Sequence, residues 1–365
     1  MIVAEIVAVV LGAFVIVHTL ASAIRSVVLP RAAPVALNDV IVSTLQKVLG
    51  AFAKGGDFAR RDNVLAFLGP LTLLLLPVAW VALLIVGFSA VFWGCGVHPW
   101  HEAFVTSGSS VFTLGFVRPK GTAMEILSFL EAGLGLGLVA LLISYLPTIY
   151  GAFARREAMV ASLEVRAGIP PSPVELLTRY SRVHMLDRID DELFLRWEQW
   201  FLEIEESHTS IPALVYFRSP QPERSWITAA GCVLDTAAIY DALVDHPPSG
   251  IGPMMMRTGF FTLRRIADGF GIVYDPAPKP TDRISVTRRE FELMQVELQA
   301  ADIPMRRDLD AAWEAFAGWR VNYDTVLVAL AHHVVAPEGR WSSDRALPPG
   351  SIAPSRWKGL RRRRS

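Results

Sequence analysis

The sequence predicts an all-α membrane protein in which three membrane-spanning helices are followed by a large helical domain. Of its 365 residues, 52% are hydrophobic and 19% are charged, and the mean hydropathy of +0.37 is typical of a membrane protein. Three apolar runs are long enough to cross a hydrocarbon core about 30 Å thick, which takes about 20 residues in a helix. After the third run, apolar residues recur at spacings of three and four among charged ones, which indicates amphipathic helices.

The three apolar runs come early in the chain. The first covers residues 2–24 of an N-terminal transmembrane segment that we assign to 1–30. The second predicts an outer transmembrane helix over 64–95, and the third predicts an inner transmembrane helix over 123–150.

The first run has a signal peptide as its alternative interpretation, because the sequence Leu-Ala-Ser-Ala near its end imitates a cleavage site. A signal peptide carries Lys or Arg ahead of its apolar core, whereas this run carries Glu5. We therefore expect a helix that is retained.

Lys and Arg are concentrated on one side of the predicted spans. They are frequent between the first two spans and after the third, whereas the connection between the second and third contains only Arg118 and Lys120. Because positive residues stay in the cytoplasm, we expect a multi-pass plasma-membrane protein with an extracellular N-terminus, an extracellular segment 96–122 and a cytoplasmic C-terminal part. Within the cytoplasmic linker 31–63, residues 38–53 follow an Asn-Asp cap with helical apolar spacing, which predicts an interfacial amphipathic helix.

The extracellular connection contains a polar stretch, Ser-Gly-Ser-Ser-Val-Phe-Thr-Leu-Gly-Phe-Val-Arg-Pro, at residues 107–119. Residues 103–112 predict a helix of about three turns, too short to cross the membrane. A short helix and a returning loop between two spans must be buried in protein or line water, because unpaired backbone groups cannot face lipid.

This order of elements resembles the pore module of potassium channels, in which a short pore helix and a Thr-x-Gly-aromatic loop lie between two spanning helices. The match covers residues 64–150, and its specific part is the Thr-Leu-Gly-Phe run. The resemblance implies a pore-loop, potassium-channel-like transmembrane module plus a helical cytoplasmic domain, and a homotetramer that conducts monovalent cations, chiefly potassium. It assigns the selectivity filter to Thr113, Leu114, Gly115, Phe116 and Val117, the pore mouth to Arg118, the pore helix to Ser109 and Ser110, and the inner-helix hinge to Gly137.

The loop departs from the potassium-channel pattern after Phe116. The family places a second glycine and usually an aspartate there, whereas this chain has Val117 and Arg118. A valine at the positive φ of that glycine would cost about 1–2 kcal/mol and remodel the outer ion sites. Four copies of Arg118 around one axis would repel cations unless Glu102 or Glu125 neutralises them. Two functions therefore stay open: a cation channel with an altered selectivity filter, and a non-conducting membrane-anchored sensor or scaffold that retains the pore fold.

One acidic residue, Glu131, lies well inside the third run. An intramembrane carboxylate is costly and normally faces protein or water. Its level along the helix predicts that it accepts hydrogen bonds from Ser107, Ser109 or Ser110 and so braces the pore helix. A role in gating or proton sensing is the alternative.

The C-terminal part, residues 151–340, predicts a mostly helical domain in which clusters of Pro and Gly mark the connections. Capping residues and apolar spacing predict helices over 172–206, 226–244, 254–267, 287–300 and 308–333. The chain has no phosphate-binding glycine loop, no Gly-x-Ser-x-Gly and no Rossmann fingerprint. We therefore predict no enzymatic activity and no cofactor.

A metal site is one alternative for this part of the chain. His184, Asp187 and Asp191 would lie on one face of the first predicted helix, where His208 or His246 could join them. Their spacing matches no metal-binding signature, and arginines nearby favour ordinary ion pairs, so we predict no metal.

Two further segments carry polar residues. The connection 206–226 could bind an anion or a neighbouring subunit, but its residues more often satisfy local backbone groups. Its polar residues are His208, Thr209, Arg218 and Arg224.

The last segment, 341–365, predicts a disordered tail. We expect its terminal run, Arg-Trp-Lys-Gly-Leu-Arg-Arg-Arg-Arg-Ser, to attract anionic lipid headgroups at about 1 kcal/mol per basic residue. No fold signal supports binding to nucleic acid.

Overall fold

The computed structural model describes residues 2–27, 36–53, 58–347 and 350–351, and the chain divides into two compact units. The first unit comprises Met1–Gly55 and Val64–Gly151, and the second comprises Gly56–Asn63 and Ala152–Ser365. Within the described ranges every regular element is a helix, and Val244 and Met305 form an isolated β-bridge. The predicted all-α class is confirmed.

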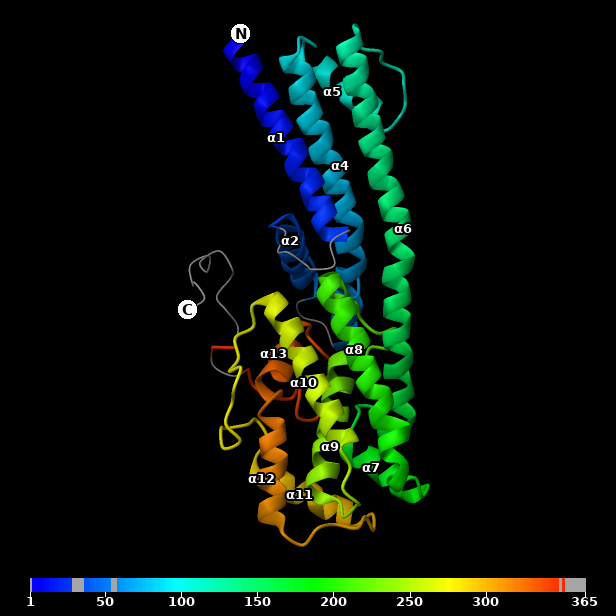
Figure 1. Ribbon diagram of the computed structural model, residues 1–365, viewed down its shortest axis with the longest axis vertical. Helices are drawn as coiled ribbons and strands as arrows, with labels where there is room; N and C mark the ends of the chain where they lie inside the picture. The colour runs from blue at the N-terminus through cyan, green and yellow to red at the C-terminus, as the bar shows by residue number, and fades with distance from the viewer. Residues whose placement is uncertain (1, 28–35, 54–57, 348–349, 352–365) are drawn as a thin grey trace. The chain divides into compact units, whose positions relative to one another are not determined.

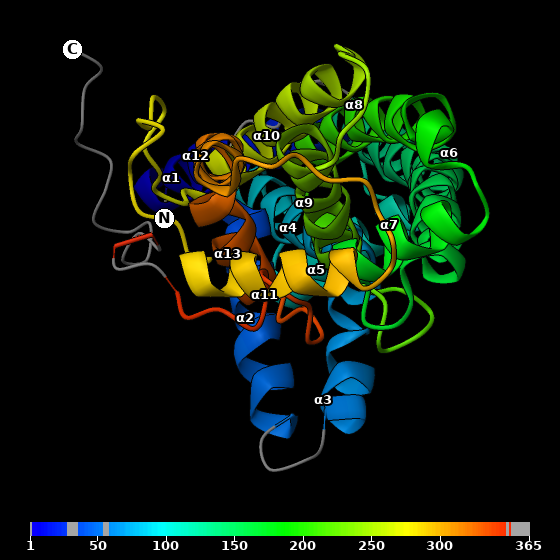
Figure 2. The ribbon, with the colours of Figure 1, turned by 90° about the horizontal axis from the view of Figure 1, so that it is seen from below.

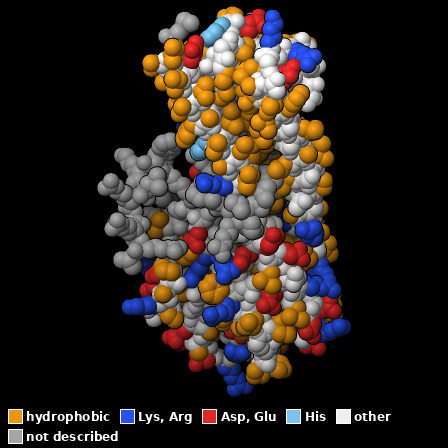
Figure 3. Space-filling view, turned by 45° about the horizontal axis from the view of Figure 1, so that its top comes forward, with side chains coloured by type: hydrophobic (Ala, Val, Ile, Leu, Met, Phe, Trp, Pro, Cys, Tyr) orange, Lys and Arg blue, Asp and Glu red, His pale blue; other side chains and the backbone are white. Residues whose placement is uncertain are grey.

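The first unit contains three helices that are long and apolar enough to cross a membrane, which indicates a membrane protein. They are α1 (Ile2–Val27), α4 (Leu68–Gly94) and the first part of α6 (Thr122–Ala167). Two shorter helices, α2 (Ala36–Phe52) and α5 (Trp100–Val111), pack against α4 (Figure 1). Figure 3 shows hydrophobic side chains over most of the visible face of this unit.

The helices α1 and α4 approach closely because glycines lie between them. A Cβ atom at Gly12 would lie 2.5 Å from the carbonyl oxygen of Gly87, and a Cβ atom at Gly94 would lie 2.5 Å from that of Glu5. Toward the other end of α1, the indole of Trp80 donates a hydrogen bond of 3.1 Å to the side chain of Ser22. Close packing and this hydrogen bond together make α1 part of the core of the first unit.

The helix α6 is longer than the predicted inner helix, which ended at residue 150. It continues through Pro147 to Ala167 without a break, and from Ala152 onward it belongs to the second unit. The apolar run does end near residue 150, but the sequence that follows is rich in Ala, Arg, Glu, Met and Leu, which are strong helix formers. The predicted helix end at residue 150 was therefore wrong.

In the second unit, α9 (Trp226–Leu243) is the central helix and is buried along nearly its whole length. The other long helices pack on α9 or on one of its neighbours. They are α7 (Pro173–Arg182), α8 (Leu195–Ser210), α10 (Ile251–Phe270), α11 (Arg288–Gln299), α12 (Leu309–Arg320) and α13 (Asp324–His333). Figure 2 shows α11 lying crosswise to the neighbouring helices. The short helix α3 (Phe58–Leu65) lies mostly in this unit, immediately before α4.

Two helices that were predicted as continuous are interrupted. The predicted helix 172–206 is divided into α7 and α8, because His184 adopts a positive φ of 54° and is followed by a 3₁₀ turn and a π turn. The predicted helix 308–333 is divided into α12 and α13 after Arg320. The predictions at 226–244, 254–267 and 287–300 agree with α9, α10 and α11 apart from their ends.

A buried ion-pair network lies at the break between α12 and α13. Arg320 donates to both carboxylate oxygens of Asp235 at 2.5 and 2.6 Å and to Asp324 at 2.7 Å. Although burial opposes it, these two carboxylates raise the pKa of Arg320 above its usual range. The same guanidinium donates to the backbone carbonyl of Trp341, whose side chain is buried.

The predicted disordered tail 341–365 therefore begins too early. Trp341 packs into the core of the second unit, and Arg345 pairs with Glu290 at 2.6 Å. These contacts were hidden in the sequence because their partners are distant along the chain. The basic run that we expect to attract anionic lipids, residues 356–365, lies outside the described residues.

Candidate functional site

The Thr-Leu-Gly-Phe segment follows α5 directly and folds back on its last turn. Ser109 and Ser110 are buried in that turn. The amide of Thr113 donates to the carbonyl of Ser110 at 2.9 Å, and the amides of Leu114 and Gly115 donate to the carbonyl of Ser109 at 2.8 and 3.4 Å. The first half of the predicted filter is thus held in a tight turn by backbone hydrogen bonds.

The strain predicted at Val117 is not found. The residues with positive φ in this turn are Thr113 at 55° and Gly115 at 69°, and Val117 is not among them. Its amide instead donates to the side-chain oxygen of Ser109 at 3.3 Å. The prediction was wrong because it placed the left-handed conformation two residues too late, beyond the glycine that can adopt it without strain.

The charge of Arg118 is paired within the same chain. Its Nε and Nη2 atoms lie 3.0 and 2.9 Å from Oε1 of Glu125, on the first turn of α6. The sequence offered Glu102 and Glu125 as partners, and the structure selects Glu125. Because the Arg118 side chain is 85% exposed, this ion pair adds at most about 1 kcal/mol to stability, but it leaves the loop without a net charge at this position.

Glu131 is fully buried and contacts α5 as predicted. The Ser107 hydroxyl oxygen lies 2.5 Å from Glu131 Oε1, and it also lies 3.1 Å from the carbonyl oxygen of Ile85 on α4. One serine thus links α4, α5 and α6. Since a hydroxyl group has a single hydrogen, it can donate to only one of these two oxygens at a time. The second carboxylate oxygen of Glu131 has no partner among the described residues.

The glycines of α6 have different surroundings. The helix continues without interruption across Gly137, where an added Cβ atom would meet nothing within 4 Å. At Gly135, by contrast, an added Cβ atom would collide with the backbone carbonyl of Val111. Gly135 is therefore the position that lets α6 approach the end of α5, and a hinge at Gly137 stays a prediction.

The residues weighed as metal ligands are not brought together. His184 lies after the end of α7, Asp187 lies in the 3₁₀ turn and Asp191 lies in the π turn, so the three do not share a helix face. Across the described part of the chain, no group of three or more His, Cys, Asp or Glu side chains is arranged to hold a metal ion.

The polar residues of the connection 206–226 make contacts inside the second unit. Burial, and then the neighbouring guanidinium of Arg156, lower the pKa of His208 well below its usual value, so this ring is neutral. Its Nε2 atom lies 3.1 Å from Nη1 of Arg156 and can accept a hydrogen bond from it. Thr209 donates to the backbone of its own helix, and Arg224 pairs with Glu164. Only the contact of Thr209 agrees with the interpretation that the segment satisfies local backbone groups, because His208 and Arg224 contact side chains of α6 that are more than fifty positions away.

The partners of the buried Arg156 and the half-buried Arg218 were not predicted. In the sequence, Arg156 is one of several positive residues after the third span, and Asp62 lies within the linker 31–63. In the structure Asp62 pairs with Arg218, which follows it by 156 positions. An acidic residue directly after two arginines and before an apolar run was a weak signal, but nothing local in the sequence identifies its partner.

Comparison of the chain with protein-family models, with curated proteins and with solved structures finds no match.

Proposed function

We propose that the protein is a potassium-channel-like cation channel whose pore is formed by four copies of the chain. The observation that carries the proposal is α5, a helix of 12 residues that is too short to cross a membrane and joins two helices that are long enough. It is held to α4 and α6 through Ser107 and leads directly into the Thr-Leu-Gly-Phe turn. Such a re-entrant arrangement needs a protein or water environment.

Exposed apolar side chains on the loop support assembly. Phe112, Leu114 and Phe116 are 57%, 62% and 65% exposed in the single chain. Large apolar side chains beside a polar backbone turn are poorly matched to water, and contacts between copies would bury them. Fourfold symmetry is the expectation for one pore motif per chain.

The pair between Arg118 and Glu125 supports cation passage. Four unpaired guanidinium groups at about 8 Å would each repel a cation by roughly 0.5 kcal/mol in water, or about 2 kcal/mol together. That is about a thirtyfold loss of local cation concentration. With Glu125 beside each Arg118, this barrier is cancelled within each chain, which favours a pore for monovalent cations, chiefly potassium.

In this proposal the protein is a multi-pass plasma-membrane protein with an extracellular N-terminus. The second unit is then the cytoplasmic domain, and the basic C-terminal run contacts anionic lipid headgroups. The charge asymmetry of the connections supports this orientation.

Single-channel recording after reconstitution in planar bilayers tests the proposal. We expect cation current with potassium on both sides and a shift in reversal potential when sodium replaces potassium on one side. A tetramer that inserts but carries no current would favour the non-conducting scaffold, provided that the double variant Val117→Gly with Arg118→Asp, which rebuilds the family's filter pattern, is also silent.

A charge variant tests the role of the ion pair. Glu125→Gln should reduce cation current by about an order of magnitude at low salt, because four unpaired Arg118 side chains then face the entrance. The loss should shrink as ionic strength rises, since salt screens exposed charges. Glu102→Gln is the matched control and should leave the current unchanged. Equal currents of the Glu125 variant and the wild type would contradict the proposed neutralisation.

A further inference from the structure

Two segments of the second unit adjoin the predicted spans directly along the chain. Gly56–Asn63 comes immediately before the first unit resumes at Val64 and leads into α4, and Ala152 continues α6 from Gly151. Both segments make buried polar contacts with one short stretch, residues 211–219, which contains a 3₁₀ turn (Pro212–Tyr216). We call this stretch the clasp loop.

The α6 side of the clasp loop is held by Arg156, which is only 2% exposed. Its Nη1 atom donates to the carbonyl of Leu214 at 2.9 Å, and its Nη2 atom donates to the carbonyl of Phe217 at 2.6 Å. One turn earlier on α6, the ring of Phe153 packs on the ring of Phe217 with centroids 5.5 Å apart. Two charge-assisted hydrogen bonds from one planar group fix both the position and the orientation of the loop relative to this part of α6.

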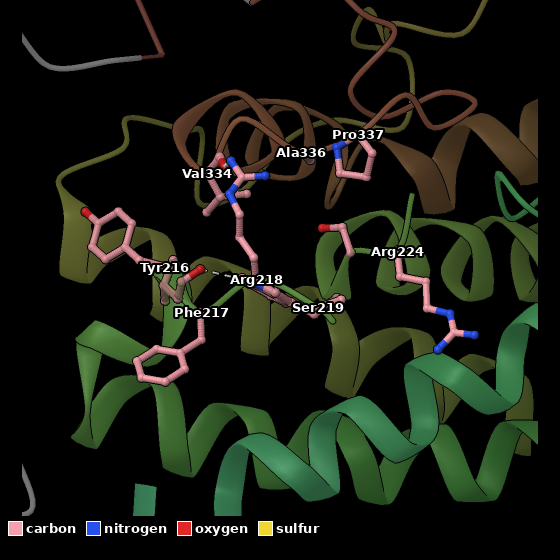
Figure 4. Close-up of a pocket in the computed structure, with 11 residues that line it drawn as sticks. Tyr216, Phe217, Arg218, Ser219, Arg224, Val334, Ala336 and Pro337 are labelled. Carbon is pink, nitrogen blue, oxygen red and sulfur yellow. Dashed lines mark hydrogen bonds between the residues drawn. The ribbon is translucent and has the colours of Figure 1, made fainter. Parts of the chain in front are cut away.

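The α4 side of the clasp loop is held by Asp62, whose side chain is buried and pairs with Arg218. The same guanidinium donates to the carbonyls of Val334 and Val335, at the end of α13, at 2.7 and 3.0 Å. Figure 4 shows the side chain of Arg218 extending from the loop toward Val334. Arg218 therefore connects α13 with the segment that leads into α4.

The neighbouring cavity is too small to give Arg218 another partner of any size. It has a volume of about 20 Å³ and is lined by the clasp loop, the start of α9 and the segment after α13. This is room for about one water molecule and not for a phosphate or a carboxylate ligand. The buried Arg156 and the half-buried Arg218 thus serve contacts within the chain.

The ion pair of Asp62 with Arg218 and the carbonyl hydrogen bonds of Arg156 hold the clasp loop from two elements. Removing one partner leaves an uncompensated charge in a buried site, which is strongly unfavourable. A shift of the clasp loop must therefore carry Asp62 and Arg156 with it or break these contacts.

We infer that the clasp loop is the coupling element through which the second unit acts on the helices α4 and α6. A rearrangement of the second unit at the end of α13 passes through Arg218 to Asp62 and into the start of α4. The same rearrangement passes through Leu214 and Phe217 to Arg156 and into α6. This inference concerns the connection between the two units and holds whether or not the assembled protein conducts ions.

Hydrogen–deuterium exchange on the full-length protein in nanodiscs tests the coupling. In Arg218→Gln, amides of residues 58–70 should exchange about tenfold faster than in the wild type, because the segment before α4 loses its anchor. Asp62→Asn keeps the side-chain shape and should give the same increase. The double variant should be no faster than either single variant, since both remove one interaction.

The surface pair formed by Arg340 and Glu297, at 3.3 Å, supplies a matched control. Arg340→Gln and Glu297→Gln should leave exchange in residues 58–70 unchanged.

The coupling is refuted if the increase in exchange in Arg218→Gln is confined to residues 211–219 and 334–336, or if the effects of Asp62→Asn and Arg218→Gln add independently. Circular dichroism should show wild-type helix content in every variant, and Asp62→Asn alone is sufficient should Arg218→Gln lose its fold. Hydrogen exchange can be measured whether or not the protein conducts ions. A protein that carries no current but shows the expected changes in exchange would therefore contradict the channel proposal and support this inference.

Discussion

At the scale of single residues, the contact between Ser107 and Glu131 shows how an acidic side chain is accommodated inside an apolar helix. The carboxyl group lies in a fully buried position, and its nearest polar partner is a hydroxyl from another helix. That hydroxyl has a second acceptor in the carbonyl of Ile85. A side chain at 131 that donates to Ser107 would let the serine donate to Ile85 and so satisfy both groups.

This geometry makes a prediction for two variants of Glu131. Glu131→Gln should be tolerated because its amide can donate to Ser107. Glu131→Leu should lower the stability of the assembled oligomer by about 1–3 kcal/mol, because the hydrogen bond that joins Ser107 on α5 to α6 is lost and Ser107 can then donate only to Ile85 on α4. Thermal unfolding in detergent measures the difference, with Ser144→Ala, whose hydroxyl bonds only to its own helix at 2.9 Å, as the control. Identical midpoints for the Gln and Leu variants would contradict the bracing role.

A second residue predicts how stability depends on pH. Burial lowers the pKa of His333 from 6.5 to about 4, and Nε2 of its ring lies 2.8 Å from the hydroxyl of Tyr216. Between these pH values the unfolded chain binds a proton at this position and the folded chain does not. The stabilising contribution is therefore complete above about pH 6.5 and is lost as the pH falls toward 4, by about 3 kcal/mol.

His333→Gln tests this pH dependence, because glutamine can accept from Tyr216 and does not titrate. Denaturant unfolding of the full chain, followed by tryptophan fluorescence at several pH values, should give a shallower loss of stability for the variant. The pKa of His208 is also lowered, so this residue contributes to the pH dependence of stability in both proteins. Parallel slopes for the wild type and His333→Gln would show that His333 titrates normally.

At the scale of elements, the glycines between α1 and α4 make their packing sensitive to one added side chain. Gly12→Leu should cost about 1–3 kcal/mol, because a Cβ atom at this position already lies too close to the carbonyl of Gly87. Gly50→Ala, on α2, is the control, since its Cβ would meet nothing within 4 Å. Crosslinking between cysteines introduced on α1 and α4 should fall in Gly12→Leu only. Retained crosslinking would mean that the two helices accommodate the added side chain without moving apart, and would contradict this prediction.

Elements were predictable where the periodicity of the sequence was undisturbed. The apolar runs identified α1, α4 and α6, and amphipathic spacing identified α9, α10 and α11. The breaks after α7 and α12 were missed because periodicity continues across them. At the first break His184 takes a left-handed conformation. At the second, the contacts of Arg320 with Asp235 and Asp324 stabilise a bend that no local residue specifies.

At the scale of the whole molecule, the order of the helices and loops could be predicted from the sequence. Contacts between residues that are far apart along the chain could not. The short helix, its loop and the level of Glu131 followed from composition and spacing alone. The partner of Arg118 was one of two alternatives, since both acids were nearby in sequence. The pairs of Asp62 with Arg218, and of Arg156 with the clasp loop, join residues separated by more than fifty positions and leave no periodic signal.

The orientation in the membrane is the remaining property of the whole chain that charge asymmetry predicts. In a Cys95→Ser background, which removes the exposed native thiol, a cysteine replaces Lys120, Lys47 or Arg307 one at a time. Lys120 lies in the connection between α4 and α6, and the other two lie in segments predicted to be cytoplasmic.

A membrane-impermeant maleimide applied to intact cells should label the Lys120→Cys protein. It should label the Lys47→Cys and Arg307→Cys proteins only after permeabilisation. The native Cys232 is buried and should stay unlabelled in folded protein. Labelling of Lys47→Cys in intact cells, with Lys120→Cys protected, would invert the topology and place the second unit outside the cell.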